Sequence, residues 1–246
     1  QKYFPAFGEK HGLTKIISFF IPATLIFISY VAIRLEISVY WDQLYHSTSI
    51  ANDSGINPYN ITISNDSLRI FEAIWVVNYS LIFFSLLAFV NLKKVKNTYL
   101  TYISLVVLII TILGFLTSGL YQLSELREAY LDKASSEFFV RGFFYIGIRY
   151  VSFLFLALAL FLCYQLTRQD FVKKKLHIPF EIVLHITILW VLSSELIHWM
   201  DMGASEQSYK LGLSILWGIY ALFLIGLGIW KKKQYLRIGA IILFGV

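Results

Sequence analysis

The chain has 246 residues, of which 58% are hydrophobic and 15% charged, and its formal net charge is +6. A soluble domain normally carries about 25% charged residues, so this composition excludes a water-soluble globular enzyme and a disordered chain. The single cysteine, Cys163, excludes a disulfide-stapled secreted domain. The basic residues stand between long apolar runs, which indicates a lipid bilayer and not nucleic acid as the partner.

Six stretches reach the length of about 20 mostly apolar residues that a membrane-spanning helix needs. We therefore predict an all-α, polytopic transmembrane bundle of helical hairpins, with six full spans and the start of a seventh at Ile238. The whole chain, 1–246, is expected to be one transmembrane domain and a fragment of a longer polytopic protein, because the last apolar run is cut at Val246. The six stretches are Lys15–Leu35, Ile70–Leu92, Thr98–Tyr121, Phe143–Leu166, Pro179–Trp199 and Leu211–Trp230.

The connection after the first span contains apolar residues at helical spacing. Ile37, Tyr40, Trp41 and Leu44 recur at i, i+3, i+4 and i+7. This pattern predicts a separate short helix that lies on the outer surface of the membrane. Turn-forming residues follow it, including Asn57-Pro58.

Lysine and arginine gather on alternate connections between the spans. The side that holds the N-terminus has 14 of the 21 basic residues and 3 of the 15 acidic ones, and the opposite side has the other 7 and 12. Because cytoplasmic loops are enriched in lysine and arginine, we expect the N-terminus in the cytoplasm and the acidic side outside. The basic connections contain Lys93, Lys94 and Lys96, then Arg168 and Lys173–Lys175, then Lys231–Lys233 and Arg237.

Glu195 and His198 form the strongest candidate for chemistry. They lie at i and i+3 in the outer third of the fifth span and so share a helix face. A carboxylate beside an imidazole relays protons, acts as a general base or helps to bind a metal. No His-Glu-x-x-His zinc pattern is present, so we expect no metal and no cofactor. The alternative is an interfacial pair that hydrogen-bonds to neighbouring helices.

Arg34, Glu72 and Arg149 are candidates for substrate binding, because ionisable residues within spans are costly and often functional. Arg149 and Arg34 together would grip a phosphate or a carboxylate. Two simpler accounts compete with this one. Glu72 would form a local ion pair with Arg69, and Arg149 would form salt bridges with an acidic stripe on the preceding helix. That stripe consists of Glu125, Glu128 and Asp132, and Arg141 is its second expected partner.

Three stretches resemble a large bacterial family of predicted multi-pass membrane proteins whose shared domain has no assigned function. They are Ser193–Asp201, Ser208–Tyr220 and Leu236–Ala240, the last of which opens a helix with Leu-Arg-x-Gly after a basic turn. The resemblance covers mainly the C-terminal third. It implies a bacterial inner-membrane protein with many spans and supplies no catalytic residues.

The first functional hypothesis is therefore an integral inner-membrane protein without enzymatic activity, a scaffold or sensor of the cell envelope that contacts other membrane proteins. The second is an outer-leaflet enzyme or carrier that acts on a lipid-linked or anionic substrate through Glu195, His198, Arg149, Glu72 and Arg34. An ion-coupled transporter is the third and weakest, because the middle of the spans reads as apolar and transporters place polar groups there.

Overall fold

The computed structural model describes residues 12–52, 61–132, 139–169, 176–203 and 209–245. The expected turn at Asn57-Pro58 and the run Lys173–Lys175 lie outside these ranges. Six described helices are long and apolar enough to cross a membrane, which confirms the all-α, multi-pass fold. Their bounds are Phe20–Ser47, Ser67–Val95, Thr98–Leu131, Phe144–Thr167, His177–Met202 and Tyr209–Trp230.

The chain forms two compact units, Gln1–Glu72 and Ala73–Val246. In the first unit, α1 is one continuous helix over Gly12–Ser47. The expectation of a separate surface helix after the first span is therefore wrong: its apolar residues simply extend α1. At 1.5 Å per residue this helix measures about 54 Å, well beyond the thickness of a bilayer core.

A short antiparallel hairpin follows α1. Strand β1 (Ile50–Asn52) pairs with β2 (Ile61–Ile63). Beyond it, the rings of Trp41 and Phe71 stack with centroids 5.4 Å apart, which joins α1 to the first turns of α2.

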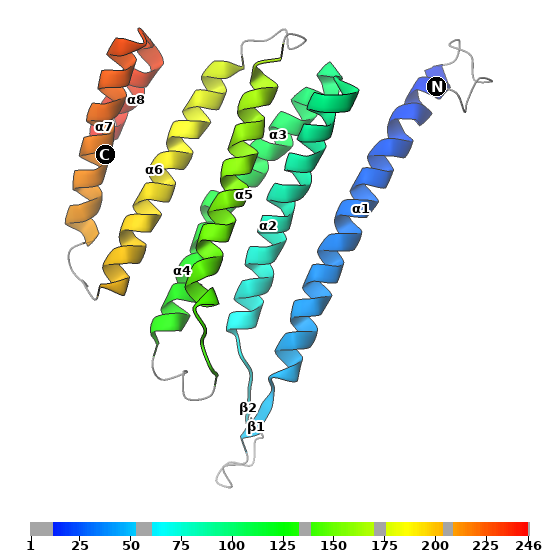
Figure 1. Cartoon of the computed structure of the whole chain (residues 1–246), viewed down its shortest axis with the longest axis vertical. Coiled ribbons are helices and arrows are strands. Elements are labelled where there is room, and N and C mark those ends of the chain that lie inside the picture. Colours follow the sequence, from blue (N-terminus) through cyan, green and yellow to red (C-terminus); the bar gives the residue numbers. More distant parts are fainter. Residues whose placement is uncertain (1–11, 53–60, 133–138, 170–175, 204–208, 246) are drawn as a thin grey trace. The chain divides into compact units, whose positions relative to one another are not determined.

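The second unit contains α2 from Ala73 onward and all later helices. Segments α3, η2 and α4 form one long helix, and each of the other helices turns back on the helix before it (Figure 1). The α2/α3 and α7/α8 turns lie at the same end of this unit as the last turn of α5 and the first turn of α6. We call this the basic end, after Lys93–Lys96 and Lys231–Lys233, and the opposite end the acidic end. The elements are α2 (Ser67–Val90), η1 (Asn91–Val95), α3 (Thr98–Gly114), η2 (Phe115–Gly119), α4 (Leu120–Leu131), α5 (Phe144–Thr167), α6 (His177–Met202), α7 (Tyr209–Trp230) and α8 (Gln234–Phe244).

Side-chain amides build the first basic turn. Asn91, fully buried, donates from Nδ2 to Oγ1 of Thr101 over 2.7 Å, and its Oδ1 accepts from the backbone N–H of Asn97 over 3.1 Å. Asn97 in turn caps α3 by accepting from the N–H groups of Tyr99 and Leu100. These bonds satisfy backbone groups that helix ends leave without intrahelical partners.

The α7/α8 turn closes through backbone geometry. Lys232 adopts a left-handed conformation with φ 53°. The N–H of Lys233 donates to the carbonyl of Gly228 over 2.9 Å, and that of Lys232 to the carbonyl of Ile229 over 3.1 Å. This pair of bonds is the Schellman arrangement that ends many helices. It directs α8 back along α7, where Gly228 is buried.

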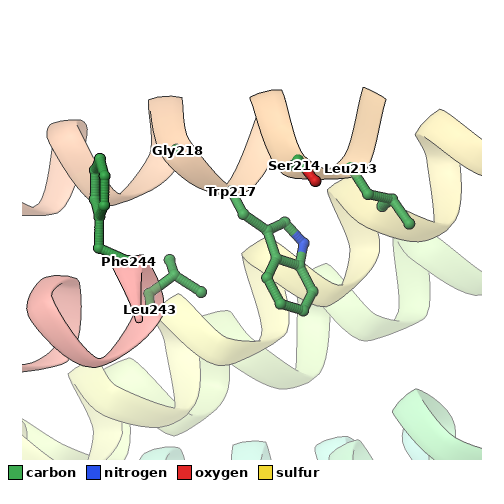
Figure 2. A pocket seen from close by; sticks show the side chains of 6 residues that line it. All are labelled: Leu213, Ser214, Trp217, Gly218, Leu243 and Phe244. Atoms are coloured by element: carbon green, nitrogen blue, oxygen red, sulfur yellow. The ribbon is translucent and has the colours of Figure 1, made fainter. Parts of the chain in front are cut away.

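A hollow of about 310 Å³ lies between α7 and the last turn of α8 (Figure 2). Its polar groups are already engaged: Ser214 donates to the carbonyl of Lys210, and Nε1 of Trp217 donates to Oγ of Ser193 over 2.9 Å. The hollow therefore presents an apolar wall and no reactive side chain. Its lining residues are Leu213, Ser214, Trp217, Gly218, Leu243 and Phe244.

Candidate functional site

Three of the five residues expected at a site lie together at the acidic end of the second unit. Arg149 of α5 is 1% exposed, and its Nε donates to Oε1 of Glu195 on α6. Its Nη2 donates to Oγ of Ser194 over 2.6 Å. His198, one turn further along α6, is also 1% exposed and feels the charges of Arg149 and Glu195. The structure thus brings Arg149, Glu195 and His198 into one buried region.

Arg127 of α4 brings a third helix into this region. Its Nη2 lies 2.7 Å from Oδ2 of Asp201, and its side chain is only 4% exposed. Neither Arg127 nor Asp201 was expected at a site from the sequence. The available signal was helical spacing: Leu123, four residues before Arg127, is buried, so position 127 falls on the same inward face.

These side chains form what we call the polar cluster. Its members lie within about 12 Å of the helix ends when measured along the axes at 1.5 Å per residue. That depth corresponds to the boundary between hydrocarbon and headgroups and not to the middle of a bilayer. The members are Arg127, Arg149, Ser194, Glu195, His198 and Asp201.

A π-helical segment precedes the helix that carries Arg127. Segment η2 (Phe115–Gly119) interrupts the long helix between α3 and α4. Each additional residue in a turn rotates the following face by about 100°, and such segments occur often at functional sites. Phe115 and Leu116, both buried, pack at this point. The segment therefore sets the direction in which α4 presents Arg127.

His198 lies between the two ion pairs without joining either. The charges of Arg149, Glu195, Arg127 and Asp201 all act on its ring. The neighbouring Trp199 meets it edge to face, with centroids 5.7 Å apart. Neither ring nitrogen has a hydrogen-bond partner among the described residues. Glu195 accepts a hydrogen bond from a neighbouring helix, as the alternative interpretation expected. The donor is Arg149 of α5.

Several donors of the cluster are buried without a partner in the described part of the chain. They are Nε and Nη1 of Arg127, Nη1 of Arg149 and the ring nitrogens of His198. A buried donor that lacks an acceptor costs about 1 to 3 kcal/mol, and more when it is charged. Guanidinium groups prefer the oxygens of phosphate or carboxylate. The arrangement is thus suited to an oxyanion, whereas no metal-binding group of three or more His, Cys, Asp or Glu residues occurs among the described residues.

The other two predicted site residues, Arg34 and Glu72, belong to the first unit. Arg34 is exposed on α1, and Glu72 is half-buried. The expected Arg69–Glu72 ion pair is not formed within the described residues: the guanidinium of Arg69 lies over the ring of Tyr45, 4.2 Å from its centroid. That Arg34 and Glu72 take part in a common site stays a prediction.

The expected pairing of Arg149 with the acidic stripe of α4 is wrong. Arg149 turns to α6 and binds Glu195. Arg141, which precedes α5, contacts the end of α4: its Nη1 donates to the backbone carbonyl of Asp132. The difference arises because position 149 faces the interior, where only a carboxylate on another buried face is within reach.

One polar side chain lies deeper than expected. Asn78 is fully buried about 16 Å along α2 from its first residue, at 1.5 Å per residue. Its amide atoms have no partner among the described residues. The middle of the spans is therefore less uniformly apolar than its composition indicates.

A second polar group joins α6 to α8 at the basic end. Nζ of Lys233 lies 2.5 and 2.6 Å from the two carboxylate oxygens of Glu181, and the hydroxyl of Tyr235 donates to the same carboxylate. Further along α6, Nδ1 of His185 is 2.9 Å from Oη of Tyr220 on α7. His185 is thus a hydrogen-bonded residue in the packing between α6 and α7.

The Glu181 contact predicts a pH-dependent contribution to stability. Its hydrogen bond raises the pKa of Lys233 above the ordinary value of 10.5. A raised pKa in the folded state means that the contribution is complete below about pH 10.5 and is lost as pH rises through the higher value. Because Lys233 is partly exposed, the contribution is at most about 1 kcal/mol.

We therefore expect Lys233→Met to melt below the wild type at about pH 8, with the difference closing above about pH 11. Melting of the detergent-solubilised protein measures this difference. Lys231→Met is the matched control, because the Lys231 ammonium lies over the ring of Trp230 instead of on a carboxylate. An equal difference at every pH would contradict the account.

Comparisons with known proteins identify no relative from which a function could be inferred. No family model, no curated protein and no solved structure matches this sequence. The resemblance of the C-terminal third to a bacterial membrane family stays a prediction, and the finding that stands is a multi-pass helical protein with a buried polar cluster at one end.

Proposed function

We propose that this chain is part of a bacterial inner-membrane protein that binds an oxyanion, such as the phosphodiester of a lipid headgroup, at the polar cluster. The acidic end would face the outside, because the lysine-rich turns at the other end favour the cytoplasm. The resemblance of Ser193–Asp201 to a bacterial membrane family supports the same location. The proposal concerns binding and assigns no reaction.

The observation that carries the proposal is that Arg127 and Arg149 are both buried and both keep N–H groups without an acceptor among the described residues. Arg149 pairs with Glu195, and Arg127 pairs with Asp201 and, at 3.7 Å, with the exposed Glu128. Each guanidinium still keeps N–H groups that meet no acceptor in the described residues. Ion pairing alone would require neither that the charge of Arg127 acts on Arg149 nor that a histidine lies on α6 three residues from both carboxylates, Glu195 and Asp201. An oxyanion that accepts from Arg127 and Arg149 together would relieve their mutual repulsion.

Position along the helices favours a ligand from the membrane interface. Arg149 is the sixth residue of α5, and Asp201 is the penultimate residue of α6. The phosphate of a lipid headgroup lies at this depth, and so does a soluble oxyanion that enters from the outer face. Both ligands offer the same tetrahedral oxygens to the guanidinium groups.

The test is binding of two phosphodiesters to the purified protein in detergent. Dimethyl phosphate is the soluble probe, and dioctanoyl phosphatidylglycerol is the lipid probe, with zwitterionic dioctanoyl phosphatidylcholine as the comparison. Because a ligand that binds only the folded state stabilises it, a probe at 100 times its Kd should raise the free energy of unfolding by about 2.7 kcal/mol. Preference for the lipid over dimethyl phosphate identifies a headgroup site, and equal effects identify a soluble anion.

Arg127→Gln should abolish most of this stabilisation, because it removes the positive charge of the guanidinium and the Nε and Nη1 donors that would bind the oxyanion. Lys210→Gln is the matched control: it removes an exposed positive charge near the acidic end without touching the cluster. If neither phosphodiester stabilises the wild type, the cluster is structural, and a scaffold or sensor remains the better account.

A further inference from the structure

The polar cluster is electrically balanced before any ligand enters it. Within the buried region, the guanidinium groups of Arg127 and Arg149 are matched by the carboxylates of Asp201 and Glu195. Glu128, 3.7 Å from Arg127, is 67% exposed and lies in contact with solvent. An additional negative charge in this buried region would have no positively charged side chain left to neutralise it. Burying a net charge in a medium of low dielectric constant is costly unless a partner of opposite charge accompanies it.

His198 is the side chain placed to supply that partner. On α6 it lies three residues from both Glu195 and Asp201, which pair with Arg149 of α5 and Arg127 of α4. The charges of all four groups act on its ring. Tyr150 on α5 is a further titratable group that interacts with Glu195 and Arg149. A neutral imidazole has one nitrogen with a hydrogen and one with a free lone pair.

The geometry points to coupled binding: a singly charged oxyanion enters the cluster together with one proton, which His198 takes up on its free ring nitrogen. This inference rests on the proposed function. The proton comes from solvent, forms an N–H bond with the imidazole lone pair, and turns the ring into an imidazolium with two donors. The cluster then carries three positive and two negative side chains, and the anion restores neutrality.

Because the protein takes up one proton when the oxyanion binds, the affinity for the oxyanion must rise as pH falls. Affinity should change about tenfold per pH unit wherever the free protein holds His198 neutral and the complex holds it charged. A phosphodiester is the right probe, because it keeps a single negative charge across this range. Any proton taken up is then taken up by the protein.

Isothermal titration calorimetry with dimethyl phosphate or dioctanoyl phosphatidylglycerol, whichever binds, tests the inference. The heat of binding at about pH 7.5 is measured in buffers of different ionisation enthalpy, and its slope counts protons. We expect about one proton per ligand in the wild type. His198→Gln should bind without proton uptake and with little pH dependence, whereas His185→Gln, whose native histidine is bonded to Tyr220, should keep the wild-type count.

Different results would contradict the oxyanion site and its coupling to a proton. Binding by the wild type with no proton uptake overturns the coupling and leaves the oxyanion site in place. Absence of binding overturns both. Loss of the proton count in His185→Gln, or its persistence in a folded His198→Gln, overturns the assignment to His198. The wild-type count is decisive by itself if a variant does not fold.

Discussion

Replacing Arg149 by methionine should lower the free energy of unfolding by about 3 to 5 kcal/mol, the scale of removing one partner from a buried ion pair. Arg149 is 1% exposed and binds both Glu195 and Ser194. Methionine fills much of the same volume but leaves the Glu195 carboxylate, whose side chain is only 20% exposed, without its guanidinium partner. Unfolding of the detergent-solubilised protein by dodecyl sulfate, followed by tryptophan fluorescence, measures the loss.

The double variant Arg149→Met/Glu195→Leu is the control for this prediction. It removes both charges together, and replacing a whole buried pair by apolar side chains is often neutral or stabilising. We expect it to recover most of the stability that the single variant loses. A double variant as unstable as the single one would show that Arg149 holds the fold through something other than Glu195.

A second large effect is expected at the α7/α8 turn. A Cβ atom built on Gly228 would lie 2.6 Å from Cγ of Arg237 and 3.2 Å from both the backbone nitrogen of Arg237 and the carbonyl oxygen of Lys233. A side chain at this position must therefore separate α8 from α7. Gly228→Leu should cost about 1 to 3 kcal/mol or more through overpacking and should accelerate hydrogen exchange in α8.

Gly226→Leu provides the matched control on the same helix. A Cβ at Gly226 meets nothing within 4 Å, and the position is exposed. Leucine there has better helix propensity than glycine by about 1 kcal/mol, so no loss of stability is expected. Equal damage by both substitutions would contradict the close approach of α7 and α8.

The sequence predicted the spans well because hydropathy is a local property. Ile70–Leu92 and Leu211–Trp230 each fall within a helix of the structure. The extent of α1 was missed, since the apolar spacing at Ile37–Leu44 is the same for a separate helix and for a continuation. Segments η1 and η2 leave no such periodic signal, because the extra residue in their turns depends on how buried side chains of the segment, such as Phe115, pack.

The sequence singled out three members of the polar cluster, Arg149, Glu195 and His198, but not the ion pairs that join them to other helices. Arg149, Glu195 and His198 stood out because ionisable side chains within a span are rare. Which carboxylate Arg149 binds depends on how helices far apart in sequence face each other, and adjacency along the chain wrongly favoured the stripe on α4. Arg127 was overlooked because its acidic neighbours suggested a solvated surface, although its register with Leu123 is that of a buried face.

The central claim is that Arg127 and Arg149 share an oxyanion, and anomalous diffraction from crystals of the protein grown with selenate tests it most directly. Selenate offers the tetrahedral oxygens of a phosphate and a strong anomalous signal. We predict a peak within hydrogen-bond reach of Arg127 Nε and Arg149 Nη1. A peak only at the lysine-rich turns, with the cluster's donors bound to water, would contradict the claim.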